Sequence, residues 1–133
     1  MKYLLDTHTF ICFIMAPEKL STKVLNIIKD GENDIYISPI TFWEIAIKHR
    51  LGKINLGKIN PIHLPNIATG YEFSILPLNA YDYATISGFP VKGDHQDPFE
   101  QMLIHTAINK NFILLSEDKK FKQYEKDGLQ LLW

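Results

Sequence analysis

Five carboxylate side chains in this sequence could hold a metal ion if the fold brought them together. They are Asp6, Glu44, Asp97, Glu100 and Asp118. Two carboxylates about 4 Å apart repel each other by roughly 4 kcal/mol at an effective dielectric constant near 20, so a cluster of them requires protons or a cation. Oxygen ligands alone favour a hard ion, Mg²⁺ or Mn²⁺, over zinc. Such an ion activates a bound water and shields phosphate charge, which is the chemistry of metal-assisted hydrolysis.

The sequence carries no other recognisable catalytic constellation. Its five histidines include no HExxH motif, and there is no Gly-rich phosphate loop and no GxSxG nucleophile elbow. The one cysteine, Cys12, lies in the apolar run "TFICFIM", where a buried structural role is expected. A lone cysteine suits a reducing compartment, and no segment approaches the roughly 20 apolar residues that cross a bilayer. We therefore expect a cytoplasmic protein without membrane contact.

Each acid also has a simpler structural interpretation. Asp97 could cap a helix that begins at Pro98, with Glu100 as its capping-box partner. Asp6 and Asp118 could cap the turns after strands, and Glu44 could face solvent from a helix. These interpretations stay open until the acids are placed in a fold.

Hydrophobic patterning places short strands between longer helical segments. Strands are expected at residues 2–6, 34–38, 73–77, 112–116 and 129–133. Helices are expected at 21–31, 39–52, 79–88, 97–111 and 118–125, with a loop and a short helix within 53–70. No element is assigned to residues 7–20. With 133 residues, the chain is interpreted as one domain spanning 1–133.

Alternating strands and helices predict an α/β fold with a mainly parallel central sheet of about five short strands, flanked by helices in three layers. Ligands of such sheets bind outside the carboxyl ends of the strands. Asp6 closes the first strand, Asp118 follows the fourth, and the other acids lie on helices expected to start near this edge. The acids are therefore predicted to converge at one edge of the sheet.

Several motifs, in order along nearly the whole chain, resemble the PIN-domain ribonucleases, specifically the VapC-like toxins of toxin–antitoxin systems. "LLDTH" resembles the first acidic motif, "SPITFWEIAIKHRLGKI" the "S…WEIAIK…GK" segment, and "HQDPFEQMLIHTA" the segment "HRDPFDRLLIAQA". "LLSED" and the terminal "LLW" resemble the family's ending. The resemblance implies a PIN-like fold and an endoribonuclease that depends on Mg²⁺ or Mn²⁺. It also implies a protein that is often dimeric and is silenced by a cognate VapB-like antitoxin.

Carried over to this sequence, the resemblance makes all five acids catalytic metal ligands, with Thr7 and Ser116 in support. Lys48, Arg50 and Lys53 are candidate contacts to the RNA backbone, although basic clusters are more often solvated faces. Phe10, Phe42 and Trp43 are candidate apolar contacts for the antitoxin, although each is more often a core residue. The chain departs from the family at Glu100, usually aspartate, and at Gln101, usually arginine. The extra methylene of Glu100 moves its carboxylate outward by about 1 Å or more.

Two alternatives remain. A catalytically inert PIN-fold module would bind RNA or protein and cut nothing. A phosphatase of the haloacid dehalogenase type also places an aspartate after its first strand, but it needs a second acid two residues later, where this chain has His8.

Overall fold

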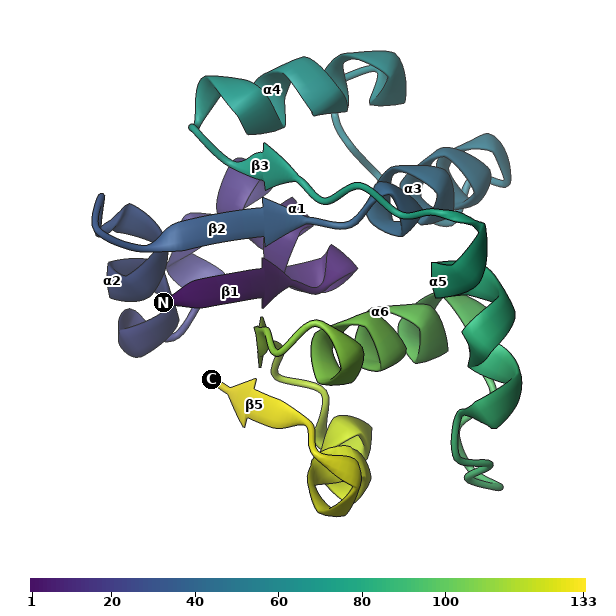
Figure 1. Cartoon of the computed structure of the whole chain (residues 1–133). Coiled ribbons are helices and arrows are strands. Elements are labelled where there is room, and N and C mark those ends of the chain that lie inside the picture. Colours follow the sequence, from purple (N-terminus) through teal and green to yellow (C-terminus); the bar gives the residue numbers. More distant parts are fainter.

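A fully parallel five-stranded sheet forms the centre of the molecule (Figure 1), and the computed structural model describes all residues 1–133. The strand order is β3-β2-β1-β4-β5. Strand bounds are β1 Lys2–Leu5, β2 Asp34–Ile37, β3 Ser74–Ile75, β4 Ile113–Leu115 and β5 Gln130–Leu132. Because β1 pairs with β2 on one side and β4 on the other, the carboxyl ends of the three innermost strands meet at the same edge.

Helices cover both faces of this sheet. The α-helices are α1 Thr7–Met15, α2 Thr22–Lys29, α3 Pro39–Arg50, α4 Leu64–Gly70, α5 Ala80–Ala84 and α6 Pro98–Asn109. The 3₁₀ segments are η1 Pro17–Lys19, η2 Pro61–His63, η3 Thr85–Gly88 and η4 Lys119–Asp127. The three-layer α/β architecture predicted from the sequence is confirmed.

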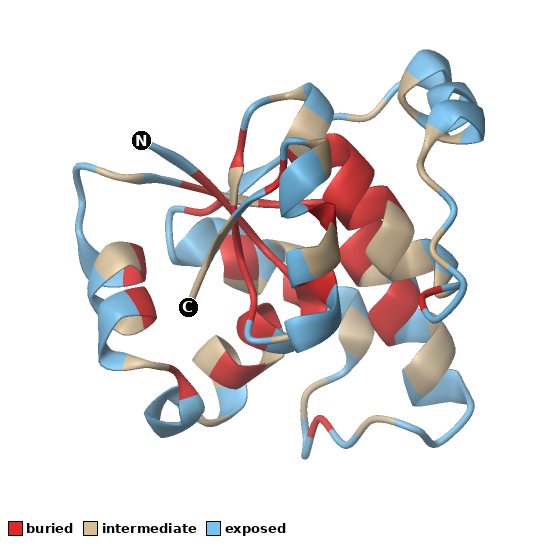
Figure 2. Cartoon of the chain, turned by 90° about the horizontal axis from the view of Figure 1, so that it is seen from below, coloured by how far each residue is buried: buried red, intermediate tan, exposed pale blue.

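Alternate residues of β1 separate the core into two halves. Leu5 points into a cluster with Phe10, Val24 and Ile45 from the helices on one face. Leu4 points into a second cluster, which α6 and η4 complete from the other face. Figure 2 shows the buried residues along the strands and on the inward sides of the helices that cover them. The period-2 alternation of β1 thus builds both cores from one strand.

Helix α1 was not predicted. Its sequence, "THTFICFIM", is apolar almost throughout and rich in β-branched and aromatic residues, so no amphipathic period marks it. Asp6 caps the helix, because its carboxylate accepts a hydrogen bond from the Thr9 N–H at 2.7 Å, and Phe10 and Cys12 anchor it in the core. Cys12 on this helix is buried, as expected.

The two outer strands are shorter or more exposed than the patterning suggested. Strand β3 contains only Ser74 and Ile75, both exposed, and β5 has one exposed and two half-buried residues. Both lie at sheet edges, where one side lacks a strand partner. None of the helices has the length and apolar character that a membrane span requires.

Candidate active site

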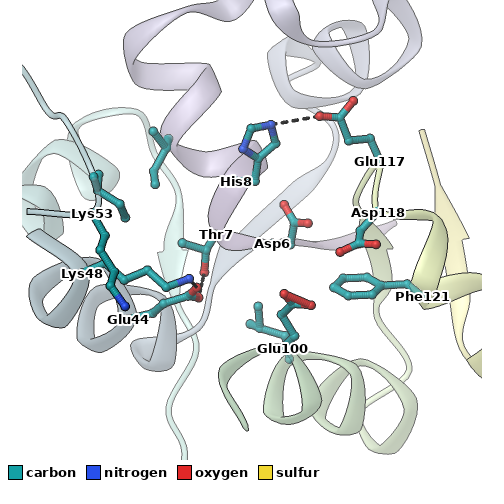
Figure 3. A pocket seen from close by; sticks show the side chains of 13 residues that line it. Asp6, Thr7, His8, Glu44, Lys48, Lys53, Glu100, Glu117, Asp118 and Phe121 are labelled. Atoms are coloured by element: carbon teal, nitrogen blue, oxygen red, sulfur yellow. Dashed lines mark hydrogen bonds and ion pairs between the residues drawn. The ribbon is translucent and has the colours of Figure 1, made fainter. Parts of the chain in front are cut away.

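A cavity of about 630 Å³ opens at the carboxyl ends of β1 and β4, and four of the five predicted acids line it. These are Asp6, Glu44, Glu100 and Asp118, joined by other polar side chains and by the apolar side chains of Ile11, Ile54, Leu103 and Phe121. Figure 3 shows Asp6, Glu100 and Asp118 pointing toward one another, while Glu44 lies apart beside Thr7 and Lys48. The acids come from four separate segments of the chain, as the sequence predicted.

Asp6 is the most deeply placed of the converging acids, with 6% of its surface exposed. It accepts a hydrogen bond from the Thr9 N–H at 2.7 Å, and the Ser116 hydroxyl acts to lower its pKa. No lysine or arginine lies within ion-pair distance of it. Burial raises the pKa of Asp6, and its hydrogen bonds only partly offset this. A buried carboxylate with a raised pKa and no basic partner is suited to binding a cation.

Asp118 lies beside Asp6 because β4 runs next to β1. Its Oδ1 accepts from the Lys120 N–H at 2.9 Å, so it caps η4 as expected. The Asp118 N–H donates to Ser116 Oγ at 3.1 Å. Ser116 is 2% exposed, and besides accepting from the Asp118 N–H it acts to lower the pKa of Asp6.

The two acids at the start of α6 have different roles. Asp97 caps the helix, accepting from the N–H groups of Phe99 and Glu100 at 2.9 and 3.2 Å, and it does not line the cavity. The expected capping box is incomplete, because the Glu100 carboxylate binds His95 Nε2 at 2.9 Å instead of the helix start. Burial raises the pKa of Glu100, the charges of Asp97 and Asp118 raise it further, and the His95 hydrogen bond opposes them. Glu100 is therefore available to the cavity and Asp97 is not.

Glu44 is buried at 4% exposure, which overturns the solvent-facing interpretation of this position. Its Oε1 accepts from Thr7 Oγ1 at 2.6 Å, and its Oε2 forms an ion pair with Lys48 one turn along α3. Thr7 also contacts Thr41 at 3.1 Å. Burial alone would lower the pKa of Lys48, but the hydrogen bond and charge of Glu44 outweigh it and raise the pKa.

The donor set fits a hard divalent ion in kind, because it consists of carboxylate oxygens from separate segments facing one cavity. No three His, Cys, Asp or Glu side chains are arranged to coordinate one ion as they stand. Loading the site would therefore require side-chain rotation or bridging water molecules. Rotation is available to the partly buried Asp118 more than to Asp6, which is buried, or to Glu100, whose Oε2 is held by His95.

Other predicted site residues are divided between the cavity and the surface. Lys48 and Lys53 line the cavity, whereas Arg50 is exposed at the end of α3 and does not. Of the candidate partner contacts, Phe10 is fully buried in the core and is not accessible. Trp43 is 57% exposed and packs edge-on against Phe99, with ring centroids 5.0 Å apart.

Sequence reasoning missed three polar residues at the site. His8 Nε2 lies 2.9 Å from Glu117 Oε1, and this exposed pair forms one rim of the cavity. His95, which holds Glu100, is buried in the segment between the helices expected at 79–88 and 97–111. For His8 and Glu117 a signal existed, because each lies within two residues of an acid at the end of a strand.

Several solved structures of other proteins share this fold. Comparison with curated proteins gives no sequence match. Among solved structures, a chain of VapBC2 from Rickettsia felis, bound to a DNA fragment from their promoter, is similar with a TM-score of 0.71 and 20% identity, over 99% of this chain and 98% of that chain. A chain of DNA-bound VapBC from Salmonella typhimurium has a TM-score of 0.66 and 16% identity, and one of VapBC-1 from nontypeable Haemophilus influenzae has 0.63 and 20%, each over 99% of this chain and 97% of that chain.

At these identities the likeness shows a shared fold. The model of the PIN domain family matches residues 3–127, which is nearly the whole chain. The chain belongs to the PIN domain family.

Proposed function

We propose that this protein is a divalent-metal-dependent endoribonuclease that acts as the toxin of a toxin–antitoxin pair. The observation that carries the proposal is the convergence of Asp6, Glu100 and Asp118 on one cavity without a basic side chain in contact with Asp6. Membership of the PIN domain family supports nuclease chemistry with a divalent ion.

In this proposal Asp6, Glu100 and Asp118 hold Mg²⁺ or Mn²⁺, with Glu44 completing the acidic wall. The bound ion supplies Lewis acidity that activates water and stabilises the leaving oxygen of an RNA phosphodiester. Ser116 orients Asp6 and Asp118, and Thr7 with Lys48 fixes Glu44. Because Asp97 does not line the cavity, its proposed role is to start α6 and to add negative charge near Glu100.

Lys53 is the basic residue best placed to contact the RNA backbone. It is exposed and lines the cavity, and no carboxylate lies within ion-pair distance of it. Its charge is therefore available to a phosphate entering the acidic cavity. Lys48 is less available because Glu44 holds it, and Arg50 contributes at most from outside the cavity.

A VapB-like antitoxin is the proposed partner, since the structural relatives named above are chains of VapBC complexes. The exposed Trp43 and its neighbour Phe99 precede Glu44 and Glu100 in the sequence, so an apolar segment bound there would lie near the acidic cavity. We also propose a cytoplasmic homodimer, on the family resemblance.

The inert binding module remains the second candidate, because no three carboxylates are preassembled for a metal. RNA cleavage by the purified chain decides between them. We expect cleavage with Mn²⁺ or Mg²⁺, none with a chelator, and a loss of at least about 100-fold in Asp118→Asn, since a ligand to the ion is removed.

The matched control is Asp34→Asn, which changes an exposed aspartate at the opposite edge of the sheet. It should cleave like the unaltered chain. Cleavage that survives both chelation and Asp118→Asn would contradict the proposal, and binding of RNA without any cleavage would favour the inert module.

A further inference from the structure

Glu100 depends on a histidine outside the cavity for its position. Its side chain is partly buried, and one oxygen, Oε2, accepts a hydrogen bond from His95 Nε2 at 2.9 Å. The other oxygen, Oε1, has no hydrogen-bond partner in the protein and remains available to the cavity that Glu100 lines. The contact therefore divides the carboxylate between a fixed oxygen and a free one.

His95 is itself held on both sides. It is 3% exposed, and its Nδ1 lies 2.7 Å from the hydroxyl of Tyr124, which is fully buried. An ionised carboxylate only accepts hydrogen bonds, so Nε2 carries the proton toward Glu100. In the neutral ring Nδ1 then accepts from the Tyr124 O–H. The chain Tyr124 to His95 to Glu100 thus has one consistent direction of donation.

The backbone and ring of His95 are also fixed. Its carbonyl accepts from the Gln101 side chain at 3.0 Å, and its N–H donates to the Lys92 carbonyl at 3.0 Å. Its ring packs edge-on against Phe121 and Tyr124, at 5.6 and 5.4 Å between centroids. The loop before α6 is therefore attached to α6 and to η4, and the imidazole has little freedom to rotate.

We propose that His95 is the positioning residue that sets the Glu100 carboxylate for the divalent ion, with Tyr124 fixing the orientation of its ring. Glutamate has one more rotatable bond than aspartate, and binding of Oε2 by His95 removes that freedom while leaving Oε1 toward the cavity. Outer hydrogen bonds of this kind orient metal ligands in proteins, and their loss typically weakens metal binding by about 10- to 100-fold. The inference rests on the proposed metal site and adds the residue that organises one of its ligands.

Mn²⁺ binding measured by calorimetry tests the inference without relying on cleavage. We expect His95→Phe to weaken Mn²⁺ affinity by about 10-fold or more. His95→Gln retains an N–H donor at the reach of Nε2 and should recover most of the affinity. Tyr124→Phe retains the ring packing and removes only the hydroxyl, so it tests the same chain of hydrogen bonds if His95→Phe does not fold.

A double-mutant cycle separates positioning from a general effect on the fold. Aspartate at position 100 is too short to keep the contact with His95, so His95→Phe should cost little further affinity in a Glu100→Asp background. Equal losses in both backgrounds, or unchanged affinity in folded His95→Phe and Tyr124→Phe, would overturn the inference and leave the metal site intact. If the unaltered chain does not bind Mn²⁺, the inference and the proposed metal chemistry both fail.

Discussion

Glu44 and Asp6 line the same cavity and are equally hidden, at 4% and 6% exposure, but the chain treats their charges in opposite ways. Glu44 has a lysine from its own helix and a threonine hydroxyl from α1. Asp6 has hydrogen-bond donors but no cation, and Glu100 and Asp118 face it across the cavity.

The difference shows which part of the cavity is incomplete. Burying a charge is unfavourable unless it is paired. The buried charge of Glu44 is compensated by Lys48 and by the hydroxyl of Thr7. At Asp6 the charge is not paired, and burial instead raises the pKa. One side of the cavity therefore contains its own counterion, and the other is suited to an added one.

The largest expected effect is on metal affinity, and it should distinguish the two sides. We expect Asp6→Asn to weaken Mn²⁺ binding by at least about 100-fold, beyond the 10- to 100-fold typical of outer hydrogen bonds. Glu44→Gln should weaken Mn²⁺ binding much less, because the Glu44 carboxylate is already paired with Lys48. Calorimetric titration of both variants measures this, with Asp34→Asn as the control on the opposite edge. Equal losses in the two variants would mean that both carboxylates are direct ligands.

The stability of the metal-free protein should change in opposite directions in the same two variants. Glu44→Gln leaves the half-buried Lys48 without its partner and should cost about 2 kcal/mol, less than the 3–5 of a fully buried pair. Asp6→Asn keeps the cap on α1 and removes an unpaired charge, so at neutral pH it should stabilise the fold by about 1 kcal/mol.

The effect of Asp6→Asn on the stability of the metal-free protein should depend on pH. The pKa of Asp6 is raised in the folded state, so its contribution to stability is present below the unfolded pKa and lost as pH rises through the folded pKa. The advantage of Asp6→Asn should therefore shrink as the pH falls. Urea denaturation at two pH values measures it, and an advantage that grows in acid would contradict the assignment.

The side of the cavity formed by Asp6 and Asp118 could be predicted from the sequence, because its position depends on the topology of the sheet. Asp6 and Asp118 follow adjacent parallel strands, so the rule for α/β sheets brings them together without any knowledge of packing. Helix α1 could not be recognised, because a helix that is apolar on all sides carries no periodic signal.

The side that depends on packing could not be predicted. The burial of Glu44 follows from the approach of α1, which brings Thr7 to it, and its spacing from Lys48 shows only that a pair is possible. The different roles of Asp97 and Glu100 follow from His95, whose position is fixed by Tyr124 almost thirty residues later. Contacts of that sequence separation leave no local pattern.

Metal binding should also depend on pH, because the carboxylates on the side of the cavity that contains no counterion must lose their protons first. Burial raises the pKa of Asp6 and of Glu100 in the metal-free protein, and bound metal requires both to be ionised. Mn²⁺ affinity should therefore weaken as the pH falls toward the pKa values of these two carboxyls, with protons released on binding. Calorimetry in buffers of different ionisation enthalpy counts those protons. In Asp6→Asn the proton release should be smaller, and unchanged release would place the titration elsewhere.

The smallest predicted effect comes from a histidine away from the cavity, and it is needed to interpret the others. His105 on α6 is 8% exposed, binds Thr85 Oγ1 at 2.9 Å and contacts Asn109. Burial lowers its pKa, and the nearby charge of Asp82 only partly opposes this. Because the pKa of His105 is lowered in the folded state, its contribution to the stability of the protein is present above the unfolded pKa. That contribution is lost as the pH falls through the folded pKa, which is the opposite pH dependence to that of Asp6. His105→Gln should flatten the loss of stability between pH 7 and 5 by less than about 1 kcal/mol, measured by urea denaturation, and should leave Mn²⁺ affinity unchanged. In the unaltered chain, the pH dependence of stability due to His105 partly cancels that due to Asp6. Only the His105→Gln variant therefore shows the contribution of the carboxylate by itself. If the stability of that variant still falls steeply in acid, another group dominates.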